Sequence, residues 1–202
     1  MLRTLLDRHL LTRLDDGGQG APGRFALADA VREHAQGVAP ALPQWAPARA
    51  AHAERVNEVV AAAAEQVRAG QSRPAHATYR AIVADIEPAL SWQREHADRL
   101  PYLRACWQAA GLHGTYGAMR LAIDCLQDAT AIAPQGRDEC DQSAWCHYML
   151  SRTQVLLGDT AAAARTIRAA RRLAHGSHDQ RLLGLIDTWL ATVLCSRMQL
   201  QP

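Results

Sequence analysis

The chain has 202 residues, 49% of them hydrophobic and 21% charged, and a net charge of +2. This length and apolar content suffice for one or two domains with a real core. The small net charge does not point to a nucleic-acid partner. All 22 basic residues are arginine, so the chain lacks the lysine of a phosphate-binding P-loop, and we expect no ATP hydrolysis by this chain alone.

Alanine dominates the apolar content, and aromatic residues make up only 5% of the chain. Such a composition favours close helix–helix packing over a sheet. The five cysteines lie scattered through helical patterns, and the N-terminal segment is amphipathic rather than a signal peptide. We therefore expect reduced thiols in a bacterial-type cytoplasm. The longest purely apolar run, residues 59–64, is too short to span a membrane, so we expect a cytoplasmic protein.

The N-terminal segment reads as a helix, a β-hairpin and a second helix. Leucines at helical spacing begin it, and residues 9–14 could turn extended. Residues 15–20 are a polar, glycine-rich turn, and residues 24–27 alternate as a short returning strand would. Asp29 is placed to cap a helix over residues 30–36, which Gly37 closes. This order predicts the C-terminal part of a winged-helix unit, over residues 1–38.

Two stretches of this segment carry a family resemblance, residues 5–11 (LLDRHLL) and 24–35 (RFALADAVREHA). They resemble the segment after the nucleotide-binding module of STAND-class bacterial transcription regulators of the LuxR, MalT and AfsR kinds. The resemblance implies a winged helix that packs on a nucleotide-binding domain, followed by tetratricopeptide-like helices. It also implies that the nucleotide-binding domain of the same regulator is a partner of this chain.

Residues 39–47 are rich in proline and are predicted to form an extended linker. Trp45 within the linker is expected to dock on a helix rather than to bind a ligand. Residues 48–69 have a helical apolar stripe that ends at Gly70. The next helical pattern starts near Pro74, and Pro88 should kink or break it.

Two later pairs of helical patterns predict antiparallel hairpins. Residues 99–112 and 115–133 turn around Gly114, and residues 142–157 and 160–174 turn around Gly158 and Asp159. Small side chains such as Ala163 and Ala170 let two helices approach closely. These features are typical of a tetratricopeptide-type hairpin, whose repeat is about 34 residues. Gly114 and Gly158 lie 44 residues apart, an excess that the polar connection over residues 134–141 could absorb.

The predicted fold is mainly α, with tetratricopeptide-like antiparallel hairpins stacked as an α-solenoid over residues 48–202. A partial winged-helix segment with one short β-hairpin precedes them. The last helical pattern, residues 181–198, has no partner after it, so either it caps the stack or the protein continues beyond Pro202. Its widely spread leucines favour the second. Leu2, Leu5 and Leu6 would lie partly uncovered, so we expect a longer protein that begins before Met1.

No known catalytic or cofactor-binding motif occurs in the chain, so we expect no catalytic residue, no cofactor and no metal. Cys140, Cys146 and His147, or His175 and His178, match no established zinc spacing. The one charge constellation is on a single helix, Arg165, Arg168, Arg171 and Arg172. It could dock an acidic partner or nucleic acid, although the solvated outer face of a repeat helix explains it more simply.

The sequence therefore predicts a non-catalytic regulatory or sensor arm of a signal-transducing, ATPase-type transcriptional regulator. It would act by binding a protein or an effector on the helical stack and biasing a nucleotide-binding domain elsewhere. The alternative is a free-standing tetratricopeptide adaptor or scaffold protein. Direct binding to nucleic acid is not expected, because a DNA-reading winged helix needs a complete helix-turn-helix before its wing.

Overall fold

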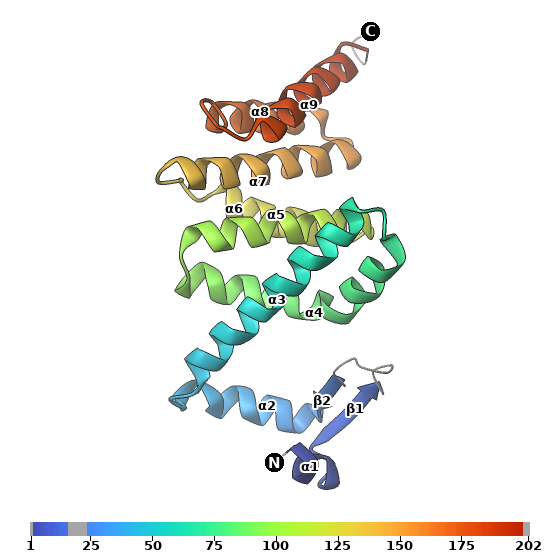
Figure 1. The fold of residues 1–202 in the computed structure, drawn as a ribbon, viewed down its shortest axis with the longest axis vertical. Helices are drawn as coiled ribbons and strands as arrows, with labels where there is room; N and C mark the ends of the chain where they lie inside the picture. The colour runs from blue at the N-terminus through green and yellow to red at the C-terminus, as the bar shows by residue number, and fades with distance from the viewer. Residues whose placement is uncertain (1, 16–23, 200–202) are drawn as a thin grey trace. The chain divides into compact units, whose positions relative to one another are not determined.

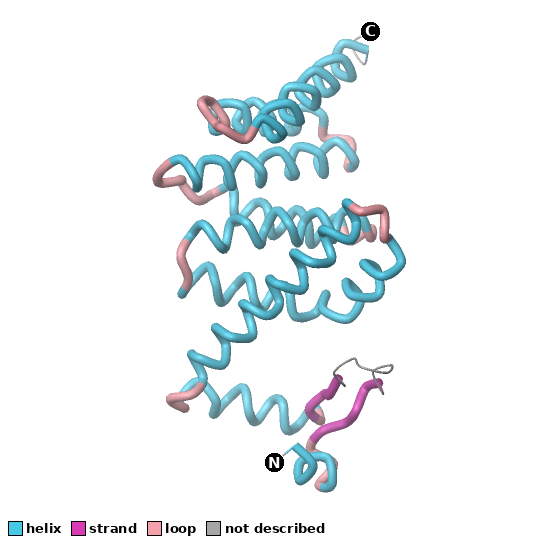
Figure 2. Tube along the Cα trace, viewed as in Figure 1, coloured by secondary structure: helices cyan, strands magenta, loops and turns pink. Residues whose placement is uncertain are grey.

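Helices make up most of the protein in a computed structural model that describes residues 2–15 and 24–199 (Figure 1). Within these two ranges the strands are confined to one two-stranded sheet near the N-terminus (Figure 2). The chain divides into two units, residues 1–49 and 50–202. The helices of the second unit are α3 Trp45–Arg68, which begins just before the division, α4 Ser72–His96, α5 Arg99–Thr115, α6 Met119–Thr130, α7 Arg137–Leu156, α8 Thr160–Leu173 and α9 Gln180–Gln199.

The first unit has the predicted order of a helix, a β-hairpin and a helix. Its elements are α1 Leu2–Asp7, β1 Leu11–Asp15, β2 Arg24–Leu27, α2 Asp29–Val38 and the 3-10 turn η1 Ala39–Ala41. The strands pair antiparallel, with Leu11 opposite Leu27 and Arg13 opposite Phe25. The turn predicted over residues 15–20 lies outside the described residues from position 16 onward. None of the described side chains in this unit is buried.

Three details of the first unit differ from the sequence prediction. Asp29 is the first residue of α2 rather than its cap, which is Ala28, and its carboxylate pairs with the Arg32 side chain one turn later. Gly37 lies inside α2, which continues to Val38. The segment 39–47 is not extended, since it forms η1 and then enters α3 at Trp45. Proline is tolerated at these positions because the first turn of a helix needs no internal N–H donor.

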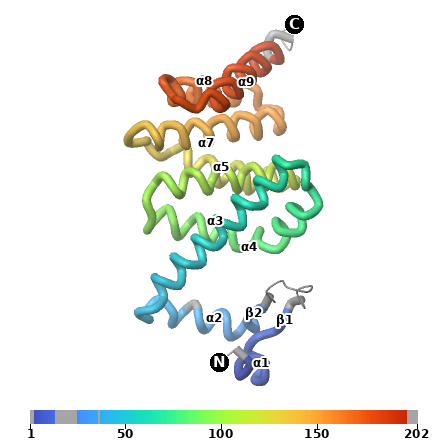
Figure 3. The backbone as a smooth tube through the Cα atoms, viewed as in Figure 1, coloured from blue at the N-terminus to red at the C-terminus, as the bar shows by residue number. Residues whose placement is uncertain are grey.

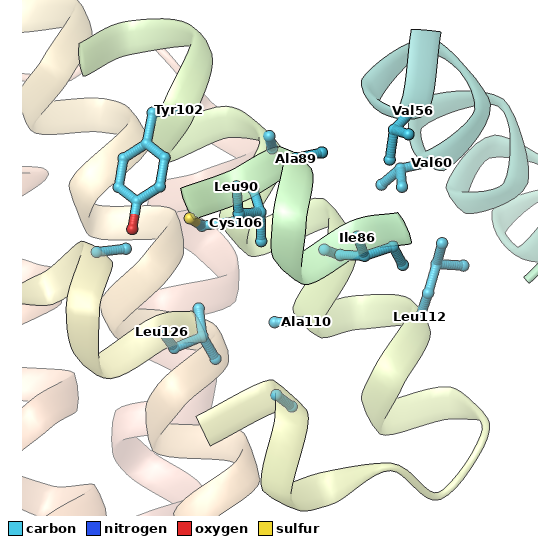
Figure 4. Close-up of a cluster of buried hydrophobic side chains, with 14 of the residues drawn as sticks. Val56, Val60, Ile86, Ala89, Leu90, Tyr102, Cys106, Ala110, Leu112 and Leu126 are labelled. Carbon is cyan, nitrogen blue, oxygen red and sulfur yellow. The ribbon is translucent and has the colours of Figure 1, made fainter. Parts of the chain in front are cut away.

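The second unit is a stack of helices in which α4, α5, α7 and α8 follow one another in chain order, with α3 running obliquely across α4 (Figure 3). Helices α5 and α6 pack as one antiparallel hairpin and α7 and α8 as the next, with α9 against α8. Alanines and leucines make up most of the core, as expected from the composition, and buried isoleucines, valines, tyrosines and cysteines complete it. In Figure 4, Val56 and Val60 of α3 lie on the side of Ile86 and Leu112, which come from α4 and α5. A mainly helical fold of stacked hairpins is therefore confirmed.

The turn between α5 and α6 lies at Gly117 and not at Gly114. Helix α5 continues to Thr115, and Gly117 has a φ of 84°, in the left-handed region that favours glycine. Gly158 has a φ of 86° at the equivalent turn between α7 and α8. Asp159 caps α8 there, because its Oδ1 accepts a hydrogen bond from the N–H of Ala162 at 2.8 Å. This second turn confirms the prediction.

Two further details of the helices differ from the sequence prediction. Pro88 was expected to kink or break its helix, and it does not break it, since α4 runs from Ser72 to His96 with the proline inside. The half-buried Pro88 is held between the buried residues Ile86 and Ala89, so tertiary packing outweighs the local cost of the proline. Helix α7 begins at Arg137 rather than near residue 142. Asp138 and Glu139 lie in its first turn, where carboxylates interact favourably with the helix dipole.

Equivalent residues recur in the two hairpins at a regular spacing. Arg99 and Arg137 lie 38 residues apart, and each begins its hairpin and donates to a carbonyl just past the hairpin's second helix. The acceptors are Ala133 O at 3.3 Å and His175 O at 2.7 Å. The repeat is therefore visible both in the chain and in the contacts that close each hairpin.

Candidate functional site

A groove of about 790 Å³ runs along the second unit. Its walls come from α3, α5, α7 and α9, which are the first helices of successive hairpins and the final helix (Figure 1). The lining residues from the two central helices are Trp107, Gln108, Gly111, Leu112 and Thr115 of α5 and Trp145, Tyr148, Met149 and Arg152 of α7. Stacked hairpins that align their first helices produce extended binding surfaces of this kind.

An aromatic strip lines the middle of the groove. The rings of Trp107 and Trp145 stack with centroids 5.0 Å apart, and Tyr148 meets Trp145 edge-on at 5.8 Å. Both tryptophans are half-buried. Trp107 Nε1 donates to Gln142 Oε1 at 2.8 Å, which fixes its ring. Ordered aromatic rings offer a large apolar contact area with little loss of side-chain entropy on binding.

A guanidinium stands beside this strip. Arg152 is exposed, and its Cζ lies 5.8 Å from the ring centroid of Tyr148 and 5.9 Å from that of Trp189. These cation–π contacts orient the charge without neutralising it. Glu65 and Arg68, at the other wall, pair with each other. The groove thus combines an apolar strip with an oriented positive charge, which suits a peptide carrying apolar and acidic side chains.

The buried ionisable groups of the core are held in their neutral forms. Tyr79 Oη and His113 Nδ1 share a hydrogen bond of 2.9 Å between α4 and α5. Burial lowers the pKa of His113 to about 4 and raises the pKa of Tyr79. Burial also raises the pKa of the Cys146 thiol, which donates to Leu103 O at 3.3 Å. Buried thiols of raised pKa are poor nucleophiles, so Cys146 is a packing residue of the core rather than a reactive thiol.

The structure places the four predicted surface arginines on the outside of α8. Arg165, Arg168, Arg171 and Arg172 are all exposed. Three of them, Arg168, Arg171 and Arg172, line a second cleft of about 930 Å³, together with Arg137 from the start of α7. Arg165 does not line it. The Arg171 guanidinium pairs with Asp187 of α9 at 2.9 Å.

The candidate metal ligands are not brought together. Within residues 2–15 and 24–199, no group of three or more histidine, cysteine, aspartate or glutamate side chains could hold a metal ion. Cys146 is fully buried, and His175 and His178 are exposed. None of the helices that the structure describes combines the length and the apolar character needed to cross a membrane.

The sequence interpretation missed the groove residues. Trp107 and Trp145 lie 38 residues apart, the same spacing as Arg99 and Arg137, so the repeat itself places both rings on equivalent positions of neighbouring first helices. That spacing was the available signal. Tyr148 and Arg152 lie four residues apart on one helix, but the second ring beside Arg152, that of Trp189, comes from another helix.

The fold and its groove define a helical-repeat protein with surfaces suited to a protein partner. Residues 75–151 and 142–197 match the family model of anaphase-promoting complex subunit 5, and together they span more than half of the chain. The chain belongs to this family. The two matches overlap within α7, as expected where a repeat is matched twice. No curated protein and no solved structure matches the chain.

This membership overturns the resemblance on which the sequence interpretation relied. The matched family is a eukaryotic family of helical repeats and not a STAND-class regulator. The predictions of a sensor arm, of transcriptional regulation and of bacterial signal transduction are therefore wrong. The resemblance rested on apolar and charged positions of amphipathic segments with no catalytic residue among them, and such patterns recur in unrelated helical proteins.

Proposed function

We propose that this chain is a non-catalytic adaptor that binds a protein partner in the groove of α3, α5, α7 and α9. The observation that carries the proposal is the aromatic strip of Trp107 and Trp145, which is half-buried, held by hydrogen bonding and stacking, and flanked by the oriented Arg152. Rings of this kind are the anchors of protein interfaces. Membership of a family named for a subunit of a complex supports a role inside a multiprotein assembly.

We propose further that the hairpins are tetratricopeptide-like, although their spacing exceeds the about 34 residues of the standard repeat. Alanines on the second helices support this assignment, since Ala122, Ala129, Ala163 and Ala170 are fully buried. Under the same proposal, residues 1–38 are a partial winged-helix segment, residues 39–47 a connector, and residues 48–202 the repeat domain. The assembly would lie in the cytoplasm.

Photo-crosslinking tests the adaptor proposal in cells of the source organism. A photoreactive phenylalanine analogue at Gln108, which is half-buried in the groove, should crosslink to a discrete protein partner. The same analogue at Arg120, which lies on α6 with 88% of its side chain exposed, serves as the matched control. The Arg152→Glu variant should lose the Gln108 crosslink, because it reverses the charge in the groove, whereas Arg104→Glu should keep it.

Two results would refute the adaptor proposal. One is an equal pattern of crosslinks from the Gln108 and Arg120 positions, which would mean that the groove is not a preferred surface. The other is a Gln108 crosslink that survives Arg152→Glu unchanged. Circular dichroism of each variant checks that the fold is intact.

A further inference from the structure

We propose that the cleft beside α8 binds an acidic amphipathic segment of a protein partner. The proposal rests on the adaptor function above and adds a second contact surface of defined chemistry. The cleft is lined by Arg137, Arg168, Arg171 and Arg172 together with Leu190 and Leu194 of α9. It thus presents positive charge and apolar surface side by side.

The cleft carries more positive charge than the chain as a whole. Among the residues that the structure describes, four arginines and no carboxylate line it, whereas the whole chain has a net charge of only +2. The remainder of the chain is therefore slightly acidic. A concentration of one sign in a concave surface attracts and orients a partner of the opposite sign.

Arg168 and Arg172 are the arginines available to a partner, since Arg168 Nη1 donates only a long hydrogen bond of 3.5 Å to Ala164 O of its own helix. Arg137 donates to the carbonyl of His175 at 2.7 Å, and Arg171 pairs with Asp187 at 2.9 Å. Among the described residues no carboxylate lies within 4.0 Å of Arg168 or Arg172. The two lie four residues apart on one helix, so their side chains are neighbours about 5–6 Å apart at Cβ. A helix with acidic residues at the same spacing could pair with both.

The apolar part of the cleft selects an amphipathic segment over a merely acidic one. Leu190 and Leu194 are half-buried and also four residues apart, so they present two apolar side chains along α9. Leu173 of α8 lies at the same cleft. A partner helix with apolar residues at helical spacing and acidic residues beside them would contact both rows.

Nucleic acid is the other polyanion to consider, and the cleft favours it less. A duplex is bound chiefly through phosphates spread along its length, whereas the two unpaired arginines lie within one helical turn. The leucines would add nothing to phosphate binding. The arrangement therefore fits a short protein segment better than a nucleic-acid backbone.

Fluorescence anisotropy with designed peptides tests the proposal on the full chain. The probe is a labelled helical peptide with leucine at positions i, i+3 and i+7 and glutamate beside them, and its counterpart carries glutamine in place of glutamate. We expect the glutamate peptide to bind at least about tenfold more tightly, and to weaken as salt rises, because exposed charges are screened. The double variant Arg168→Glu/Arg172→Glu should lose at least about tenfold in affinity.

The matched control changes the net charge equally at another place. Arg80→Glu/Arg104→Glu alters two exposed arginines on α4 and α5, and it should change the affinity by less than about twofold, since the change lies outside the cleft. Leu194→Asn should weaken both peptides. An equal loss in the two double variants would overturn the proposal, and so would equal binding of the glutamate and glutamine peptides.

Two further comparisons distinguish a protein segment from nucleic acid, and the cleft proposal from the groove proposal. Tighter binding of a DNA duplex than of the glutamate peptide, lost in the Arg168→Glu/Arg172→Glu variant, would replace the protein segment with nucleic acid and overturn the proposal. Failure of the peptide assay leaves the crosslink at Gln108 untouched. Conversely, peptide binding in the cleft is measured without reference to the groove, so the two proposals fail independently.

Discussion

Ser151 is the side chain that ties the last three helices together, and its removal should measurably destabilise them. Its hydroxyl donates to Ala163 O of α8 at 2.9 Å and accepts from Trp189 Nε1 of α9 at 3.0 Å. The residue is fully buried in α7. A Ser151→Ala substitution removes both hydrogen bonds without adding volume, so the change isolates their contribution.

The expected loss follows from the state of the groups left behind. A net hydrogen bond contributes about 1 kcal/mol, and a buried donor left without an acceptor costs about 1–3 kcal/mol. Trp189 is half-buried, so water can partly replace the lost acceptor and the lower end applies. We therefore expect Ser151→Ala to reduce the free energy of unfolding by about 2 kcal/mol.

A double-mutant cycle with Trp189→Phe measures the bond itself. The phenylalanine keeps an apolar ring but has no indole N–H, so the coupling energy between the two sites should be about 1 kcal/mol. Urea unfolding followed by far-UV circular dichroism gives each free energy. Thr188→Ala, an exposed change on the same helix whose hydroxyl bonds only to Gly184 O, should cost less than about 0.5 kcal/mol. A coupling energy of zero would refute the stabilising link between α7 and α9.

Three other predictions test the core, a turn and thiol burial. Burial lowers the pKa of His113 to about 4, so between pH 6.5 and 4 the unfolded chain binds more protons than the folded one. The free energy of unfolding should therefore decrease as the pH is lowered through this range, and urea titrations should show a weaker pH dependence in His113→Gln. Gly117→Ala should destabilise by about 1 kcal/mol, because φ is 84° there, whereas Gly114→Ala in α5 should be neutral or slightly stabilising. In the native protein a thiol reagent should label exposed Cys195 quickly and leave buried Cys146 unlabelled until denaturant is added.

The helices were predictable because their apolar residues recur at helical spacing, and the hairpin at Gly158 was predictable from its turn chemistry. Predictions from single glycine and proline residues were less accurate where tertiary packing determines the course of a helix. Gly114 has the composition of a turn, yet α5 runs through it because the next positive-φ glycine, Gly117, lies one turn later. Pro88 was expected to kink or break α4, but the helix is not broken, and the neighbours Ile86 and Ala89 are buried in the core.

The candidate site was harder to predict than the fold, since its residues meet only in space. The arginines of α8 were recognisable as a cluster on one helix. The sequence could not show that Arg171 forms an ion pair with Asp187, or that Arg137 of α7 lines the same cleft. The groove needs residues from four helices. The sequence spacing pairs Arg152 with Tyr148 of the same helix, but it cannot show that Trp189 of α9 lies beside the same guanidinium.

The spacing between equivalent residues of the two hairpins reveals an insertion in the second hairpin. First-helix positions recur at 38 residues, and the pairs Leu112 with Leu150 and His113 with Ser151 are buried in both copies. The turn glycines Gly117 and Gly158 lie 41 residues apart, and beyond them equivalent residues keep this spacing, as the fully buried Leu126 and Ile167 show.

Three residues are therefore inserted after Ser151, at the turn end of α7, which has 20 residues against 17 in α5. Leu156 and Leu157 lie in that extension and are 66% and 56% exposed. The insertion lengthens one hairpin beyond its neighbour without disturbing the Trp107–Trp145 register. The groove can thus keep its aromatic alignment while the turn end of the second hairpin diverges.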